Sequence, residues 1–325
     1  MRILFAGSPA IAVPALRALA ALEREGVCVL AGVLTNPDSA RGRHGKPEPT
    51  EVGAAALEAA AERGNSAGMP VLKFEKLDGT AREAAAALEA DLLVSFAYGR
   101  IFGPLFLGLF PLGGINVHPS LLPRYRGPTP IQAAILNGDT ETGISIQQLA
   151  LEMDAGDILA SERFPLSGRE TAETLSVLAA ERAAGMLAAV VRRSAAEGAV
   201  AAGQRQNPAK AVYCSLLTKE EGRIDWKQSA REIDRRIRAF TPWPLCLTRH
   251  GEAELYVLAG RPFDSAMENG AAPGTVLGVD KQHGILIQTG DGIFAAERLQ
   301  YRTKKALDWR SFLNGSQTLI GSRLK

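Results

Sequence analysis

The start of the chain decides the fold, in the stretches RILFAG (residues 2–7), AVPALRALAALER (12–24) and VCVLAGVLTN (27–36). The first is a short apolar run that ends in a glycine. The second has the three-to-four-residue apolar period of a helix, and the third is again strand-like. A helix that joins two strands predicts a β-α-β unit with a parallel sheet. The chain therefore opens as an α/β domain.

The same alternation continues along the next eighty residues. Helical patterns at 53–64 and 80–90 alternate with strand patterns near 69–74, at 91–99 and at 113–118. This order predicts a doubly wound, mostly parallel sheet that binds its ligands at the carboxyl ends of the strands. The first turn, FAGSPA, lacks the later glycines of the dinucleotide motif GxGxxG, so a dinucleotide site is not expected. Residues 36–52, rich in proline, glycine and charge, are expected to form a long exposed loop.

The second half of the chain has a different pattern. After a helical run at 171–195, residues 198–210 have the composition of a linker. A helix is predicted over 229–240, and several short strands separated by glycines follow it, which is typical of a small β-barrel. We therefore expect a catalytic domain over residues 1–197, a linker over 198–210 and a C-terminal β-barrel domain over 211–325.

The composition restricts the class of protein. The chain has 325 residues, of which 46% are hydrophobic and 22% charged, enough for a full core and two domains. Its three cysteines are far apart and include no CxxC pair, so neither a disulfide framework nor a metal site is expected. We see neither a signal-peptide pattern nor an apolar stretch of membrane-spanning length, and we expect a soluble, cytoplasmic protein.

The two halves of the chain differ in charge. Residues 1–200 hold 18 Lys and Arg against 22 Asp and Glu, whereas residues 201–325 hold 19 against 13. The net charge of +2 thus divides into −4 and +6. A basic C-terminal half suggests contact with a polyanion, although a solvated basic face without a partner is an equally valid interpretation.

Three polar side chains suggest a reaction centre: Asn116 and His118 in GGINVH, and Asp154 in LEMDAGDIL. Residues i and i+2 of a strand share a face, so the amide and the imidazole should point together, with Ile115 and Val117 toward the core. An amide can hold the oxygen of a carbonyl under attack, and a carboxylate can orient an imidazole and raise its pKa.

Each of these residues also has a purely structural interpretation. His118 alone is better explained as a hydrogen-bonded structural histidine, and Asp154 as a turn residue before Ala-Gly. Asp157 lies in the same turn and could take the place of Asp154 beside the imidazole. No serine or cysteine nucleophile is evident nearby, so the attacking group should come from the substrate.

The run NVHPSLLPRYRG (116–127), with MDAGD (153–157) downstream, closely resembles the signature of the formyltransferases that use 10-formyltetrahydrofolate. Within that family the chain is most similar to the branch that acts on methionyl-tRNA. FAGSPAIAVPAL (5–16), PTPIQAAILNGDTETG (128–143), KEEGRIDW (219–226) and FTPWP (240–244) all occur in the expected order. The resemblance covers nearly the whole chain.

The resemblance implies a Rossmann-like formyltransferase domain followed by an OB-like β-barrel. It also implies transfer of the formyl group of 10-formyltetrahydrofolate to the α-amino group of methionine on initiator Met-tRNA, for translation initiation, without a metal and without a stable protein partner. The catalytic trio would be Asn116, His118 and Asp154. The residues that match the family's folate site are Ser120, Leu121, Leu122, Pro123, Phe96, Ala97 and Tyr98.

The resemblance also points to residues that would contact tRNA. In tRNA formyltransferases a basic loop after the second strand enters the acceptor stem, and the basic C-terminal domain covers the tRNA. The matching residues here are Arg41, Arg43, His44, Lys46, Arg235, Arg236, Arg238, Lys304 and Lys305. The loop departs from the family pattern, because consecutive lysines are absent and Glu48 and Glu51 follow closely. Arg124 and Arg126 could contact the glutamate tail of the folate or RNA, and a solvated role without a partner is the alternative.

Two other functions remain compatible with the sequence. The first is N-formylation of an amino sugar nucleotide on the same catalytic domain, and the second is RNA binding by a relative that has lost catalysis. The basic loop and the basic C-terminal half favour tRNA over a sugar nucleotide, and the intact trio argues against loss of catalysis.

Overall fold

The computed structural model describes residues 1–40, 45–62, 68–264, 270–316 and 318–325. Contacts between Cα atoms divide the chain into two compact units. Unit 1 comprises residues 1–130, 141–165 and 176–214, and unit 2 comprises residues 131–140, 166–175 and 215–325. The predicted domain boundaries stay a prediction.

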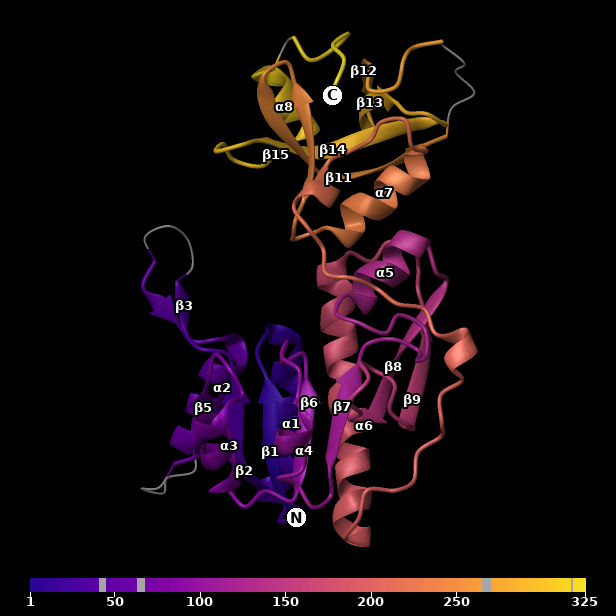
Figure 1. Ribbon diagram of the computed structural model, residues 1–325. Helices are drawn as coiled ribbons and strands as arrows, with labels where there is room; N and C mark the ends of the chain where they lie inside the picture. The colour runs from indigo at the N-terminus through magenta and orange to yellow at the C-terminus, as the bar shows by residue number, and fades with distance from the viewer. Residues whose placement is uncertain (41–44, 63–67, 265–269, 317) are drawn as a thin grey trace. The chain divides into compact units, whose positions relative to one another are not determined.

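Unit 1 is built on a seven-stranded sheet in the order β5-β2-β1-β6-β7-β8-β9 (Figure 1). Five strands are parallel to their neighbours, whereas β8 and β9 are antiparallel. The strands are β1 (Arg2–Gly7), β2 (Val29–Thr35), β5 (Val71–Lys73), β6 (Leu92–Phe96), β7 (Gly114–His118), β8 (Glu141–Gln148) and β9 (Ile158–Pro165). The predicted mostly parallel α/β sheet is confirmed.

Helices cover both faces of this sheet (Figure 1). They are the one-turn η1 (Ala10–Ala12), α1 (Val13–Arg24), α2 (Glu51–Glu62), α3 (Gly79–Ala86), α4 (Pro104–Leu107) and α6 (Ala172–Glu197). Alternate residues of β1 serve different layers: Leu4 and Ala6 belong to the cluster that contains Ala85 of α3 and Phe106 of α4. This two-sided burial explains why the central strands read as continuous apolar runs.

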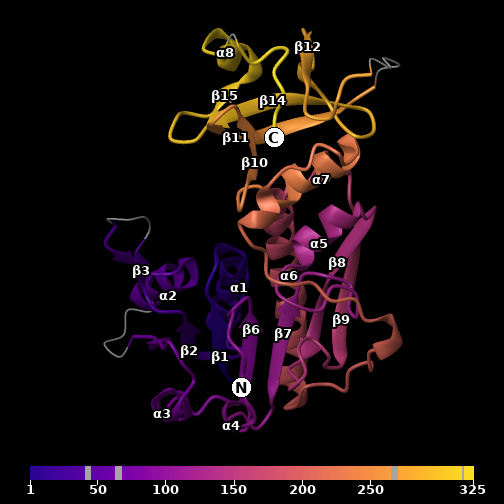
Figure 2. The same ribbon diagram turned by 45° about the horizontal axis from the view of Figure 1, so that its top comes forward.

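The antiparallel end of the sheet forms the turn that carries Asp154. β8 pairs with β7 so that Val117 faces Ile146, and β9 then returns along β8 (Figure 2). Ile115, Val117 and Ile146 are buried, as the alternation along the strand predicts. Gln148 at the end of β8 pairs with Ile115 near the start of β7, and the turn that follows carries Asp154.

Two parts of unit 1 differ from the sequence-based expectations. The segment 36–52 is not irregular throughout, because β3 (Ser39–Ala40) and β4 (Pro47–Glu48) pair as a short antiparallel ladder. The stretch predicted to be a linker runs along unit 1 up to Cys214: Ile158 and Gln204 exchange backbone hydrogen bonds of 2.8 Å, and Cys214 N–H donates to the Arg126 carbonyl at 2.8 Å. Backbone pairing of this kind cannot be read from a Gly- and Ala-rich composition.

Helix α6 corrects another expectation, that the chain holds no apolar stretch of membrane-spanning length. Among the described residues, this 26-residue helix is long and apolar enough to cross a membrane by length and composition alone. Alanine-rich core helices of domains pass the same test. Buried positions recur every three or four residues along α6, at Ala179, Ala183, Leu187 and Val190, as in a helix with one packed face.

Unit 2 is built on an antiparallel sheet in the order β10-β11-β14-β13-β12, with β15 paired to β14. Its strands are β10 (Cys246–His250), β11 (Ala253–Phe263), β12 (Val276–Asp280), β13 (Gly284–Gln288), β14 (Ile293–Tyr301) and β15 (Leu307–Asp308). Its helices are α7 (Ala230–Ala239) and α8 (Trp309–Asn314), with the single turn η3 (Glu220–Gly222). Helix α5 (Pro130–Asn137) belongs almost wholly to this unit. The single turn η2 (Pro208–Lys210) belongs to unit 1.

The last residues of the chain join the two edges of the sheet in unit 2. Lys325 exchanges backbone hydrogen bonds with Arg249 of β10, and Leu324 N–H donates to the Gly274 carbonyl ahead of β12. Gly321 and Ser322 pair with Val276 of β12. Both edge strands thus find partners in the C-terminal segment, which gives the sheet the closed hydrogen bonding that a small barrel needs.

This closure predicts a large loss of stability when Leu324 is shortened. Leu324 is buried, with 2% exposure, so Leu324→Ala should lower the free energy of unfolding by about 2–4 kcal/mol. The neighbouring Lys325 is exposed, and Lys325→Ala, which keeps the backbone pairing, should change it by less than about 0.5 kcal/mol. Denaturant unfolding of both variants measures the difference. Equal stability of the two variants would contradict this account of the barrel.

Candidate active site

The Asp154 carboxylate lies beside both members of the Asn116–His118 pair. Its Oδ1 atom is 3.4 Å from Asn116 Nδ2. Its Oδ2 atom is 3.6 Å from His118 Nδ1, and the two side chains of that pair are 12% and 5% exposed. The prediction that Asn116 and His118 share one face of their strand is confirmed, because both face one carboxylate.

Asp157, the alternative partner for the imidazole, lies elsewhere. Its backbone carbonyl accepts a hydrogen bond of 2.9 Å from Gln148 N–H, and its Cβ atom lies close to Gly203. Asp157 therefore belongs to the pairing between the end of β8 and the segment after α6. The structure thus separates two acidic residues that the sequence left as alternatives.

Two further groups hold the Asp154 carboxylate in place. Gly127 N–H donates to Oδ2 at 2.8 Å, and the Gln147 side-chain amide donates to Oδ1 at 2.8 Å. Gln147, on β8, is buried with 1% exposure. Hydrogen bonds of this kind favour the charged form of a carboxyl group and fix its direction. These two bonds thus orient the Asp154 side chain, little of which reaches solvent.

The His118 imidazole is buried between two acceptors. Its Nε2 atom is 2.8 Å from the Tyr125 carbonyl oxygen, so Nε2–H donates there and Nδ1 faces Asp154. Burial lowers the pKa of His118 below its ordinary value of 6.5, although the Asp154 carboxylate and the Tyr125 carbonyl each raise it. The expectation that Asp154 raises the imidazole pKa is right for that one contribution, but burial outweighs it.

This arrangement defines what the imidazole can do. A neutral ring that donates from Nε2 keeps its lone pair on Nδ1, and the contact between Nδ1 and Asp154 is longer than a hydrogen bond. When Nδ1 takes up a proton, the resulting cation lies beside a fixed anion and still donates to the Tyr125 carbonyl. The pair is therefore suited to accept a proton during a reaction and to release it afterwards.

Backbone strain is concentrated around the same residues. Ala97, Tyr125 and Asp154 have φ angles of 51°, 59° and 53°, in the left-handed region that non-glycine residues seldom occupy. Each such residue costs of the order of 1–3 kcal/mol and is kept where the surrounding contacts demand it. In Asp154 this conformation accompanies the hydrogen bonds that aim its carboxylate at the imidazole.

The loop expected to line a folate site is fixed by Ser145 of β8. Ser145 Oγ donates to the Ser120 carbonyl at 2.8 Å and accepts from Leu122 N–H at 3.1 Å. Ser120 Oγ in turn donates to the Arg124 carbonyl at 2.6 Å. Ser120 and Leu122 are buried, whereas Leu121 and Pro123 are partly exposed. The loop is thus a rigid wall next to His118, and Leu121 and Pro123 are its accessible members.

The other expected folate segment has its side chains turned mostly inward. Phe96 and Tyr98 are buried, with 1% and 2% exposure, and the Tyr98 ring stacks on Phe102 at 5.4 Å between centroids. Ala97 between them is exposed. The Tyr98 hydroxyl has no hydrogen-bond partner among the described residues, and burial raises its pKa. A ligand at this strand end would meet the backbone around Ala97 rather than the two rings.

Sequence reasoning missed two polar residues around the trio and misplaced a third. Gln147 and Gln206 are buried, with 1% and 5% exposure, and so is Arg126, at 2%. Gln206 lies in the predicted linker, and Arg126 was expected to face a ligand. Only the burial of Gln147 has a signal in the sequence, and a weak one: Gln147 lies within the apolar strand GISIQQL.

The residues expected to contact tRNA are placed unevenly. Arg41, Arg43 and His44 lie outside the described residues, and Lys46 is exposed just before β4. Lys304 and Lys305 are exposed in the turn after β14, with the Lys304 ammonium 5.6 Å from the centre of the Tyr301 ring. Arg236 donates to the Glu221 carbonyl and lies over the Phe240 ring.

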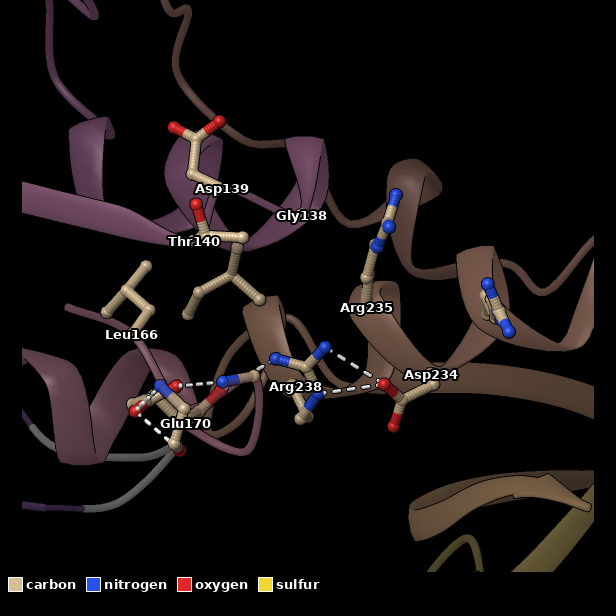
Figure 3. A pocket seen from close by; sticks show the side chains of 12 residues that line it. Gly138, Asp139, Thr140, Leu166, Glu170, Asp234, Arg235 and Arg238 are labelled. Carbon is tan, nitrogen blue, oxygen red and sulfur yellow. Dashed lines mark hydrogen bonds and ion pairs between the residues drawn. The ribbon is translucent and has the colours of Figure 1, made fainter.

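Arg235 and Arg238 line a cavity of about 270 Å³ within unit 2 (Figure 3). Arg238 is held by internal partners: it pairs with Asp234 at 2.9 Å and donates to the Glu170 carbonyl at 3.0 Å. Arg235 instead lies against Gly138, where any Cβ atom would come within 2.2 Å of the guanidinium carbon. A ligand could therefore engage Arg235 without breaking the ion pair between Arg238 and Asp234.

The described part of the chain contains no group of three or more His, Cys, Asp or Glu side chains arranged to hold a metal ion. The chemistry derived above uses an amide, an imidazole and a carboxylate only.

Comparison with known proteins identifies two family domains in the chain. Residues 1–191 match the family model described as formyl transferase, and residues 216–317 match the formyl transferase C-terminal domain. Methionyl-tRNA formyltransferase of Treponema denticola is 48% identical over 323 residues, which is 98% of each chain. The protein of the same name from Treponema pallidum is 45% identical over 330 residues, covering 100% of this chain and 99% of the relative.

Solved structures with low sequence identity share the fold. HypX from Aquifex aeolicus, in complex with tetrahydrofolic acid, matches 98% of this chain and 48% of its own with a TM-score of 0.63 at 18% identity. WlaRD, a sugar 3N-formyl transferase, matches 94% of this chain and 99% of its own with a TM-score of 0.63 at 17% identity.

The cavity in unit 2 yields a prediction about stability. Burial raises the pKa of the Asp234 carboxyl, and Arg238 opposes this effect. Arg238→Ala would leave Asp234 without its cation, and because both side chains are only 16% exposed, we expect a loss of about 2 kcal/mol in the free energy of unfolding. Arg231→Ala, at an exposed position of the same helix, is the matched control and should change little. Thermal unfolding measures both variants. Equal stability of Arg238→Ala and Arg231→Ala would show that the ion pair between Arg238 and Asp234 does not stabilise the fold.

Proposed function

The chain belongs to the formyl transferase family, and we propose that it transfers the formyl group of 10-formyltetrahydrofolate to the α-amino group of methionine on initiator Met-tRNA. The observation that carries this proposal is the likeness to methionyl-tRNA formyltransferases over the full length of the chain, through both family domains. The site described above supplies groups for the reaction. We place the activity in the cytoplasm, in translation initiation.

The proposed reaction joins the amine to the formyl carbon and releases N10 of the folate. A free α-amine titrates near pH ~8, so a neutral fraction is available for attack at neutral pH. The oxygen of the formyl group gains negative charge as the new C–N bond forms. Asn116, which is partly exposed at the end of β7, donates its side-chain amide to this oxygen.

The proton that the amine loses has an acceptor in the same site. His118 Nδ1 takes it, the Asp154 carboxylate stabilises the imidazolium, and the Nε2–H bond to the Tyr125 carbonyl keeps the ring in place. The bond from the formyl carbon to N10 then breaks, and the proton passes to N10. Every proton is accounted for, and His118 returns to its neutral form.

The folate is proposed to bind along two walls beside the trio. One wall is the loop held by Ser145, of which Leu121 and Pro123 are accessible. The other is the segment that follows β6, in which Ala97 is exposed. Ser120, Leu122, Phe96 and Tyr98 shape these walls from inside, because they are buried. The residues present therefore fit a flat, partly apolar ring system more readily than a large charged group.

Acceptor binding is proposed for two basic surfaces. The loop that holds Arg41, Arg43, His44 and Lys46 is one, and Arg235 with Lys304 and Lys305 on unit 2 is the other. These groups are proposed to contact phosphates, which position an RNA without reading its sequence. Arg236 and Arg238 have internal partners, so we propose that they support this surface from within.

The direct test offers the protein 10-formyltetrahydrofolate with charged initiator tRNA or with an amino sugar nucleotide. We expect formyl-methionyl-tRNA as the product, with an affinity for tRNA that falls steeply as salt rises. Formylation of the sugar nucleotide with Met-tRNA untouched would overturn the proposal. Binding of tRNA without turnover would assign the chain to RNA binding alone.

Substitution of the trio should lower turnover without unfolding the protein. We expect Asn116→Ala and His118→Ala each to lower kcat by at least about 10²-fold, the usual scale for an oxyanion donor or an acid–base group. His283→Ala is a matched control, since His283 forms a similar pair with Asp280 at 2.7 Å in unit 2. Turnover near that of the wild type in His118→Ala would remove the catalytic assignment.

The lowered pKa of His118 sets the acid limit of activity. His118 must be neutral to accept a proton, so kcat/KM should fall as the pH drops through its pKa, which lies below 6.5. The Asp154 carboxylate raises this pKa. Asp154→Asn should therefore shift the acid limb to still lower pH while lowering the maximal rate. A pH–rate profile tests this, and an acid limb that moves to higher pH in the variant would contradict the assigned roles.

A further inference from the structure

Gln206 is a buried amide that binds the backbone of the Asp154 turn. Its Nε2 atom donates to the Asp154 carbonyl at 2.9 Å and to the Gly156 carbonyl at 2.7 Å. An amide nitrogen has two hydrogens, so these two contacts use both, and the 3.2 Å contact with Gln147 Oε1 is a weaker third. The side chain thus binds two backbone carbonyls of the turn that carries Asp154.

Arg126 determines which way the Gln206 amide points. The Arg126 guanidinium donates to Gln206 Oε1 from Nε at 3.1 Å and from Nη2 at 2.9 Å. A cation on the oxygen side leaves only the NH₂ side of the amide for the turn. The third nitrogen of the Arg126 guanidinium, Nη1, donates to the Glu152 carboxylate at 3.2 Å and to the Tyr213 hydroxyl at 3.1 Å. Arg126 is therefore engaged inside unit 1 and does not face a substrate.

The turn that Gln206 binds has little freedom of its own. A Cβ atom at Gly156 would lie 1.8 Å from the Gln148 carbonyl oxygen, so the turn presses against the end of β8. Asp154 adopts a φ of 53°, which its own conformational preferences disfavour. The two hydrogen bonds from Gln206 to the carbonyls of Asp154 and Gly156 hold the backbone of this turn.

We propose that Gln206 is a positioning residue for Asp154 and that Arg126 orients Gln206 for this role. The proposal rests on the proposed part of Asp154 in formyl transfer. It assigns a function to a residue of the stretch 198–210, which the composition predicts to be a linker. Gln206 lies between the backbone pairing of Gln204 with Ile158 and that of Cys214 with Arg126.

Gln206→Met tests the proposal, because methionine has a similar size but cannot make these hydrogen bonds. Gln204→Met is the matched control: it changes the same residue type two positions earlier, on an exposed side chain. Gln206→Glu is a second variant, which retains an acceptor for Arg126 but replaces the donors to the turn. The measurements are kcat, KM for each substrate, thermal unfolding, and the NMR titration of the His118 imidazole without substrate.

We expect Gln206→Met and Gln206→Glu to lower kcat by about 10-fold or more, since a misplacement of the order of 1 Å can cost as much as 10²-fold. The KM values should change far less than kcat. The His118 pKa should fall in Gln206→Met, because a displaced carboxylate raises it less. The Gln204→Met variant should match the wild type in all four measurements.

Other results would overturn the proposal. Wild-type kcat in Gln206→Glu would do so, and so would an unchanged His118 pKa in Gln206→Met. A loss of kcat that equals the loss of folded protein would reduce Gln206 to a structural residue. The titration needs no acceptor substrate, so a shifted His118 pKa in a protein that does not formylate Met-tRNA would uphold the positioning role while the proposed function failed.

Discussion

A carboxylate with little access to water is held next to a buried imidazole, and most of the site is organised around that contact. Moving an ion out of water is costly unless hydrogen bonds replace the lost solvation. Asp154 obtains them from Gly127 N–H and from the Gln147 amide, each at 2.8 Å. These bonds also fix the direction of the carboxylate, so the proton affinity of His118 depends on where the turn between β8 and β9 is held.

The fold supplies these groups from separate parts of the sequence. Strand β7 places Asn116 and His118 on one face, and the turn between the two antiparallel strands β8 and β9 carries Asp154, whose carboxylate reaches both. The loop after β7 contributes the Tyr125 carbonyl. The segment after α6 contributes Gln206. A rigid sheet thus carries the reacting groups, and irregular segments close around them.

Much of this could be predicted from local patterns. The β-α-β opening follows from the apolar periods of residues 2–36, and the shared face of Asn116 and His118 follows from the two-residue repeat of a strand. Long-range pairing could not be predicted in this way. The burial of Gln206, the choice of Asp154 over Asp157 and the closure of the barrel by Leu324 depend on hydrogen bonds between residues far apart in the sequence. The backbone pairing of residues 204–214 with unit 1 could not be predicted either, because a Gly- and Ala-rich composition suits a linker and a packed segment equally well.

The central claim is that Asp154 acts through His118, and a double-mutant cycle tests it most directly. Single-turnover rates of formyl transfer would be compared for the wild type, His118→Ala, Asp154→Asn and the double variant. The account predicts that the double variant is about as slow as the slower single variant, because either change disables the same proton transfer. Rate losses that multiply, as for two independent groups, would contradict it.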